Sequence, residues 1–195
     1  MIQPDPPPRM APLDPDDLSA EATAFLDRWT GGFFKNAGSN PVLQTLAHHP
    51  QLADLFSQLN VHLLSTSAVP VRLRQIAIMR TAWLCEATYM WSSHLNTSLT
   101  CGLEPEIFGP LKAGAESAYF TAFEKTVILA TEELVRDRKI SDARWAALGA
   151  EWSEQQLLDF MFTVGVYVTV AGVMRSTGVQ RQQNLLELAE RYGAP

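Results

Sequence analysis

The segment from Phe160 to Met174 constrains the fold more than any other, because its fifteen residues carry no charge. It belongs to a longer helical pattern that opens with Ser153 and Gln156, a capping-box pair. Fifteen residues are fewer than the about 20 that a helix needs to cross a bilayer. In a soluble protein, a helix that is apolar on every side is buried on several sides. We therefore expect the helix over residues 157–174 to lie between other helices or between subunits.

Helical patterns cover most of the remaining chain, whereas strand signals are scarce. The longest pattern opens at Pro70 and ends at Gly102, a natural C-terminal cap. This is long for a globular helix, so we expect a kink or a break near Cys85–Thr88. Shorter helices are expected over 18–29, 50–65, 118–137 and 141–149, and a Gly- and Asn-rich loop over 31–41. The predicted fold class is all-α.

The size and charge of the chain limit its partners. Its 195 residues are the size of one ordinary domain, and 47% of them are hydrophobic, enough for a sizeable core. The 15 basic and 21 acidic residues give a net charge of −6. Nucleic acids and anionic membranes are bound through basic surfaces. We therefore expect neither nucleic acid nor a membrane as a partner.

The first 17 residues are rich in proline and acidic residues. They lack the basic and apolar regions of a signal peptide, so we expect a cytoplasmic protein. Proline favours an extended chain, which leaves two interpretations: a disordered tail, or an arm laid across a neighbouring subunit. Residues 18–195 are expected to form a single helical domain.

The stretch CEATYMWSSH, residues 85–94, gathers several residue types that carry chemistry. On a continuous helix, steps of three and four place His94 on one face with Arg80, Trp83, Ala87, Met90 and Trp91. A lone histidine among aromatic side chains is most often a packed core or interface residue. In the alternative interpretation, burial lowers the pKa of the imidazole and favours a general base, while the aromatic rings stack on a planar substrate.

Metal and disulfide chemistry find little support in the sequence. A metal site needs about three converging ligands, and no two histidines have a metal-binding spacing. The four histidines are His48, His49, His62 and His94. Cys85 and Cys101 would lie about 24 Å apart along one helix, whereas a disulfide needs Cα atoms within about 7 Å. We expect no metal and no disulfide.

Four stretches carry a resemblance to a known family: NPVLQTLAHHPQLADLFSQLNVHLL, RLRQIAIMRTAWLCEATYMWSSHL, EELVRDRKISDARWAAL and QQLLDFMFTVGVYV. In this order they resemble the carboxymuconolactone decarboxylase family, a relative of the alkylhydroperoxidase D proteins. The resemblance covers about residues 29–180, and the part from Arg80 to His94 is the most specific. It implies an all-helical, alkylhydroperoxidase D-like fold in dimers, trimers or hexamers, with pockets near subunit contacts and no organic cofactor.

The departures from the family pattern matter as much as the match. The peroxidase branch carries cysteines seven and four residues before its histidine, where this chain has Ala87 and Met90. Neither side chain can form a thiolate or a disulfide. The branch closest to this sequence commonly has Glu at the position of Met90, and the family commonly has Glu at the position of Gln75. Two acidic groups expected around the histidine are therefore absent, while His94 is retained.

Several cations and hydroxyls could replace the lost carboxylates. Arg72, Arg74 and Arg80 are candidate cations near the histidine, and Arg175 follows the uncharged segment where relatives usually carry Asn. Arg175 either complements the helix dipole or holds a substrate carboxylate or phenolate. The hydroxyls of Tyr89 and Tyr167 either form hydrogen bonds with backbone groups or donate to a developing oxyanion.

The resemblance implies a cofactor-independent lyase that decarboxylates, or cleaves a C–C bond in, a small lactone or aromatic acid. The expected catalytic residues are His94, Tyr89 and Tyr167. The expected substrate-binding residues are His62, Gln75, Arg80, Trp83, Met90, Trp91 and Arg175. A second hypothesis is a non-enzymatic or ligand-sensing protein that retains the pocket, and a third is residual alkylhydroperoxidase activity.

Overall fold

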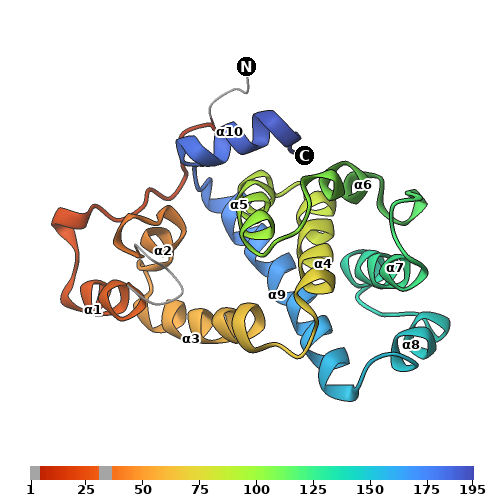
Figure 1. The fold of residues 1–195 in the computed structure, drawn as a ribbon. Helices are drawn as coiled ribbons and strands as arrows, with labels where there is room; N and C mark the ends of the chain where they lie inside the picture. The colour runs from red at the N-terminus through yellow and green to blue at the C-terminus, as the bar shows by residue number, and fades with distance from the viewer. Residues whose placement is uncertain (1–4, 31–36) are drawn as a thin grey trace. The chain divides into compact units, whose positions relative to one another are not determined.

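The computed structural model describes residues 5–30 and 37–195. Within these ranges every element longer than one residue is a helix, and no strand is formed (Figure 1). The all-α prediction is confirmed. The chain divides into two compact units, which are described separately. One comprises residues 67–173 and 181–195, and the other the described part of 5–66 together with 174–180. Two expectations stay predictions: that residues 1–17 form an arm, and that residues 18–195 form a single domain. Of the loop expected over 31–41, residues 31–36 lie outside the described residues.

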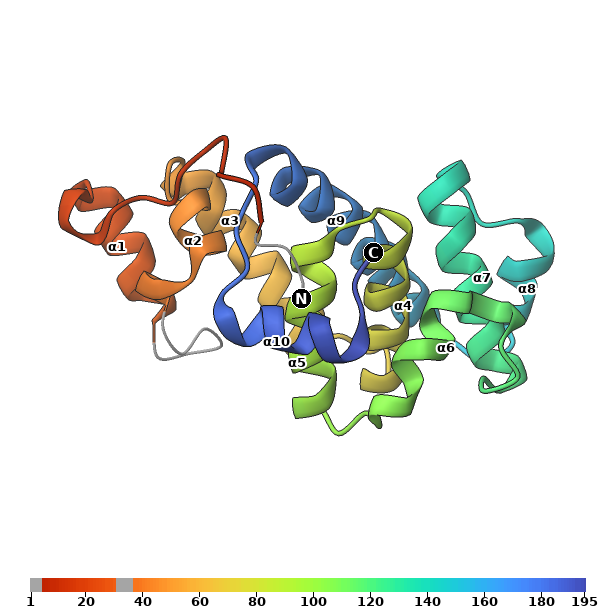
Figure 2. The ribbon, with the colours of Figure 1, turned by 90° about the horizontal axis from the view of Figure 1, so that it is seen from above.

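The larger unit is arranged around one buried helix. Its helices are α4 (Val71–Leu84), α5 (Thr88–Thr100), α6 (Phe108–Ala113), α7 (Ala122–Asp137), α8 (Asp142–Gly149), most of α9 (Glu154–Thr177) and α10 (Gln183–Tyr192). Helix α4 packs against α5, α6 and α7, and every residue from Arg74 to Ala82 is buried. Helix α10 packs against α5 (Figure 2). The chain thus encloses α4 on several sides.

The long helix expected from Pro70 to Gly102 is broken near the expected place. Helix α4 ends at Leu84, and α5 begins at Thr88. Glu86 between them has a φ of 50°, a left-handed conformation that few non-glycine residues adopt. The amide of Ala87 donates to the carbonyl of Ala82 (2.9 Å), which closes the end of α4. The continuous face expected from Arg80 to His94 therefore does not form, because its two halves lie on different helices.

Two ion pairs, one largely buried and one partly exposed, fasten α4 to α7. The guanidinium of Arg80 lies 2.7 Å from Glu132 Oε1 and donates to the carbonyls of Leu111 (2.9 Å) and Lys112 (2.8 Å). At the start of α4, Arg72 Nε donates to Glu124 Oε1 (2.6 Å). These contacts fix the position of α4, and with it the residues that α4 presents to α5.

Helix α9 is apolar on all sides but buried on only one. Phe160, Val164 and Tyr167 are buried, whereas Leu158 and Phe162 keep 54% and 56% of their surface exposed. By length and composition α9 could cross a membrane, with a mean hydropathy of 1.8 over 18 residues, of which 39% are buried. A single such helix is weak evidence for a membrane span, because core helices of soluble proteins share these properties. The burial expected over residues 157–174 is thus incomplete within one chain.

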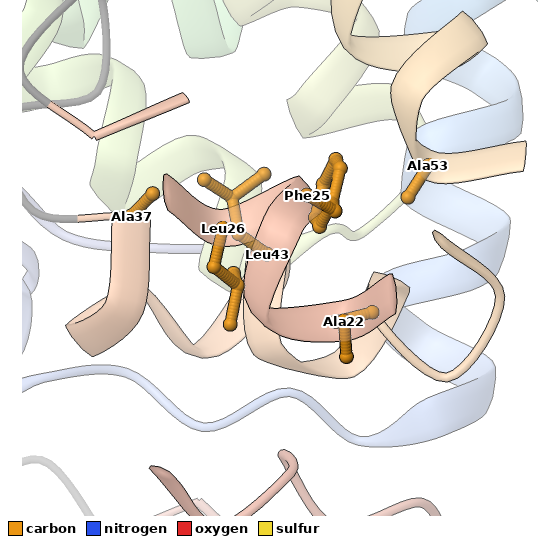
Figure 3. Close-up of a cluster of buried hydrophobic side chains, with 7 residues drawn as sticks. Ala22, Phe25, Leu26, Ala37, Leu43 and Ala53 are labelled. Atoms are coloured by element: carbon orange, nitrogen blue, oxygen red, sulfur yellow. The ribbon is translucent and has the colours of Figure 1, made fainter. Parts of the chain in front are cut away.

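The smaller unit contains α1 (Ala20–Trp29), α2 (Pro41–Leu46) and α3 (Pro50–Val61), followed by a π-helical turn, His62–Thr66. Its core is a cluster of apolar side chains, most of them alanine, shown in Figure 3: Ala22, Phe25, Leu26, Ala37, Leu43, Ala47 and Ala53. The N-terminal segment is bound to this unit. The amides of Arg9 and Met10 both donate to the carbonyl of Thr177 (2.8 and 3.0 Å).

Candidate functional site

The candidate site is centred on His94, which lies near the middle of α5 and keeps 7% of its surface exposed. Its Nδ1 lies 3.1 Å from Oε1 of Gln75, a residue of α4 that is 1% exposed. The hydroxyl of Ser98 donates to the same Gln75 oxygen (3.2 Å). Since Ser98 follows His94 by four residues, both reach α4 from the same face of α5. The hairpin of α4 and α5 therefore holds the imidazole ring by one nitrogen.

Helix α9 supplies the second ring of the site. Tyr167, 3% exposed, meets His94 edge to face, with ring centroids 5.1 Å apart and an interplanar angle of 79°. Among residues 5–30 and 37–195, none offers a hydrogen bond to His94 Nε2 or to the Tyr167 hydroxyl. Neither atom is among the fully buried side-chain atoms without a partner, so both keep some accessible surface. Two accessible polar atoms on rings in contact are an arrangement that a ligand can satisfy.

The electrostatics of the site keep both rings uncharged. Burial, with a smaller contribution from the positive charge of Arg74, lowers the pKa of His94 to about 3. Burial raises the pKa of Tyr167 well above its usual range, although Arg74 opposes this. Burial also lowers the pKa of Arg74, whose Nη1 donates to the carbonyl of Val69 (3.3 Å). At neutral pH the site contains a neutral imidazole, a protonated phenol and a guanidinium.

Asp159 of α9 is the buried carboxylate of this region. Its Oδ2 accepts from the amide of Ala68 (2.6 Å), just before α4 begins. Its negative charge also acts on Arg74. Asp159 thus ties the residues just before α4 to α9, and its negative charge partly balances the buried guanidinium of Arg74.

The two tryptophans expected to line the site contact other groups. Trp83 and Trp91 meet edge to face with centroids 5.2 Å apart. The indole of Trp91 donates to the carbonyl of Gly193 (2.7 Å), and Lys112 Nζ lies over both rings at 5.5 and 5.9 Å. Lys112 also donates to the carbonyl of Tyr192. These contacts hold the segment after α10 against α5 and α6.

The remaining expected residues have separate surroundings. Arg80 binds Glu132 and the two carbonyls already described, and Met90 is 1% exposed in the core. Tyr89 is buried, which raises its pKa to about 12. Arg175 is exposed and belongs to the smaller unit. His62 belongs to that unit too, with its Nδ1 2.9 Å from the Thr66 hydroxyl. Of the expected site residues, the structure brings His94, Gln75 and Tyr167 together.

Sequence reasoning missed Ser98 and Asp159. Ser98 could have been found, because it lies four residues after His94 on the same helix face. Asp159 gives no such signal, since its role depends on the packing of α9 against the start of α4.

Within the described ranges, no three His, Cys, Asp or Glu side chains are grouped so that they could hold a metal ion. Cys85 and Cys101 form no disulfide within the described residues; Cys85 is half-buried and Cys101 exposed. The positions that resemble the peroxidase cysteines, Ala87 and Met90, are both buried.

No protein-family model and no curated protein matches the sequence. Solved structures match its fold. The debrominase Bmp8, as a cysteine-to-alanine variant in complex with 2,3,4-tribromopyrrole, has a TM-score of 0.78 at 12% identity, covering 96% of this chain and 99% of that one. The alkylhydroperoxidase AhpD core of a peroxidase-related protein from Ralstonia eutropha has a TM-score of 0.77 at 13% identity, covering 92% and 95%. A peroxidase-related protein from a Silicibacter species has a TM-score of 0.75 at 15% identity, covering 99% and 97%. The chain has the AhpD-like helical fold.

Proposed function

We propose that this chain of AhpD-like fold is a cofactor-independent lyase of the carboxymuconolactone decarboxylase type, acting on a small lactone or aromatic acid. The observation that carries the proposal is the buried pair of His94 and Tyr167. The Nε2 and hydroxyl of this pair have no partner among the described residues, and the charge of Arg74 acts on both rings. A ligand with complementary groups would supply the missing hydrogen bonds.

Each of the three side chains has a role in such a reaction. Loss of carbon dioxide, or cleavage of a C–C bond, leaves an electron pair that must be delocalised into an enolate and then protonated. Arg74 provides positive charge for that enolate, and Tyr167, which keeps its proton, donates a hydrogen bond to the developing oxyanion. Nε2 of His94 takes a proton from the substrate and returns it to carbon. A substrate carboxylate near Arg74 would raise the pKa of His94 toward the range that proton transfer needs.

Two further observations support a small ring-shaped ligand. The stretch from Arg80 to His94 resembles the reaction-centre segment of the carboxymuconolactone decarboxylases. The debrominase that shares this fold was solved with 2,3,4-tribromopyrrole, a small planar ring. Both observations favour a compact cyclic substrate over a long chain.

A second function, ligand binding without turnover, is favoured by a specific observation. The pKa of His94, about 3, makes the free imidazole a weak base at neutral pH. Gln75 and Met90 also stand where the resembled family commonly has carboxylates. In this function His94 and Tyr167 would recognise a ligand without moving its protons.

One experiment separates the two functions. The chain is incubated with a panel of small lactones and aromatic acids, binding is measured by calorimetry, and release of carbon dioxide and loss of ultraviolet absorbance are followed. Turnover that falls about a hundredfold or more in His94→Ala, but not in the control His48→Ala at an exposed histidine, supports the lyase. Binding without turnover supports the second function. Turnover that survives in a folded His94→Ala overturns the role of His94.

A further inference from the structure

We infer that Gln75 sets the tautomer of His94, so that Nε2 is a hydrogen-bond acceptor and the ligand meets it through an O–H or N–H group. The inference rests on the site of the proposed function, but it requires no turnover there. Gln75 is a positioning residue in this role, because it acts on the ligand only through His94.

The geometry fixes where the imidazole proton lies. An amide oxygen only accepts hydrogen bonds, and Oε1 of Gln75 faces both Nδ1 of His94 (3.1 Å) and the hydroxyl of Ser98 (3.2 Å). Nδ1 must therefore carry the proton when the ring is neutral. The lone pair of the ring is then at Nε2, the nitrogen to which no residue of the described chain donates.

The groups around the ring keep it in this neutral form. Helix α4 contributes the guanidinium of Arg74 and the uncharged amide of Gln75, α5 contributes the hydroxyl of Ser98, and α9 contributes the phenol of Tyr167. A carboxylate in place of Gln75 would stabilise an imidazolium, whereas an amide oxygen does so weakly. Nε2 is therefore presented as an acceptor.

Tyr167 completes the recognition pattern. Its hydroxyl keeps its proton and lies on the ring that contacts His94, so the site presents one acceptor and one donor. A protonated phenol, an enol or an azole N–H matches the acceptor. Their conjugate anions do not, because an anion has no proton to donate to Nε2. The ligand class is therefore a small ring compound that bears an acidic O–H or N–H group.

The tautomer is measurable without any substrate. In long-range proton–nitrogen correlation spectra of protein labelled with nitrogen-15 histidine, the ring nitrogens of the two tautomers have different chemical shifts. The His94 signals are identified as those that are missing from the spectrum of the His94→Asn variant. We expect the Nδ1–H pattern in the wild type and in the control Ser98→Ala, which keeps the Gln75 oxygen. In Gln75→Leu the pattern should shift toward Nε2–H. In Gln75→Glu it should return, with the pKa of His94 raised by at least about one unit.

An Nε2–H pattern in the wild type would overturn the inference. It would mean that the side-chain amide of Gln75 has the flipped orientation and donates to His94 through its nitrogen. An unchanged pattern in Gln75→Leu would also overturn the inference.

The ligand class is tested with phenol and anisole, which differ by the hydroxyl proton. Phenol should move the Nε2 resonance of His94 in the wild type, and anisole should not. Equal movement by both, or movement by neither, would contradict the assignment of an O–H or N–H donor. Turnover is not part of this readout. A chain that shows the Nδ1–H tautomer but no lyase activity would therefore disprove the proposed function and leave the role of Gln75 intact.

Discussion

The imidazole of His94 on α5 and the phenol of Tyr167 on α9 meet edge to face, with centroids 5.1 Å apart, although neither bonds to the other. The contact fixes the two rings by packing and leaves their polar atoms for a ligand. Edge-to-face pairs of this kind contribute about 0.5–1.5 kcal/mol beyond the area that they bury.

Tyr167→Phe keeps this ring contact and removes only the hydroxyl. Because the hydroxyl has no hydrogen-bond partner in the described chain, we expect the free energy of unfolding to change by less than about 1 kcal/mol. Turnover should fall by about a hundredfold if the hydroxyl donates to an oxyanion. Urea unfolding and a rate assay on the same sample check both points. A large loss of stability with full turnover per folded molecule would make Tyr167 a structural residue.

Stability should depend on pH through His94. Its pKa is about 3 in the folded chain and about 6.5 in an unfolded chain. Between these values the unfolded chain binds more protons, so this contribution is complete above about pH 6.5 and is lost as the pH falls toward 3. We expect the free energy of unfolding to fall by at most about 1.4 kcal/mol per pH unit below pH 6.

Urea unfolding between pH 5 and 7 measures this dependence and avoids the range in which carboxylates such as Glu104, with a pKa of about 2, lose their contribution. The slope should flatten in His94→Gln. An equal slope in both proteins would show that another group causes it.

Gly114 marks a close approach to the Arg80 ion pair. Its φ is 74°, and a Cβ there would lie 2.6 Å from Nη2 of Arg80 and 2.8 Å from Oε1 of Glu132. Gly114→Ala should therefore cost about 2 kcal/mol or more, through backbone strain and displacement of the guanidinium. Gly149→Ala is the matched control, because nothing lies within 4 Å of its Cβ position. Thermal unfolding of both variants should separate them, and equal melting temperatures would refute the steric argument.

The thiols should be dispensable for activity. Cys85 and Cys101 lie just after the last residues of α4 and α5. Neither is among the residues that contact the His94 ring, although Cys101 acts electrostatically on Arg74. A double change to serine should leave any turnover within a few-fold of the wild type. A loss of more than about tenfold, equivalent to roughly 1.4 kcal/mol, in a protein that still folds would reinstate peroxidase chemistry.

We propose that the exposed apolar side of α9 is covered by another copy of the chain. Leu158 and Phe162 are one helical turn apart and more than half exposed. Sedimentation of the wild type should show a homo-oligomer, and Leu158→Glu with Phe162→Glu should shift it toward the 21.6 kDa monomer. Lys139→Glu is a charge-matched control on an exposed position. A wild type that is monomeric at micromolar concentration would disprove the proposal.

Local structure could be predicted well from the sequence. The capping pair Ser153 and Gln156 forms reciprocal hydrogen bonds of 3.0 and 3.3 Å, and Gly102 ends α5 with a φ of 83°. Such features depend on neighbours within a few residues, which spacing and residue type describe. The helical segments could be predicted for the same reason.

The composition of the site could be predicted only in part. His94, Gln75 and Tyr167 were expected from the resemblance, but helical spacing also placed Arg80 and Trp83 beside His94. The break expected near Cys85–Thr88 separates these residues, but its geometry, with a left-handed φ at Glu86, leaves no pattern in the sequence. The contacts of Arg80 with Glu132, and of Trp91 with Gly193, join distant segments, so local periodicity could not predict them.

The break between α4 and α5 also bears on the order in which we expect the site to assemble during folding. In one straight helix, Gln75 and His94 would lie about 28 Å apart, and the short turn at Glu86 brings them into hydrogen-bond contact instead. A contact between residues so near in sequence closes a small loop and carries a low entropic cost. Tyr167 joins from a far more distant segment, so its contact with His94 closes a larger loop. Low-cost local contacts tend to form first, so we expect the tautomer of His94 to be set within a folding hairpin before Tyr167 makes its contact.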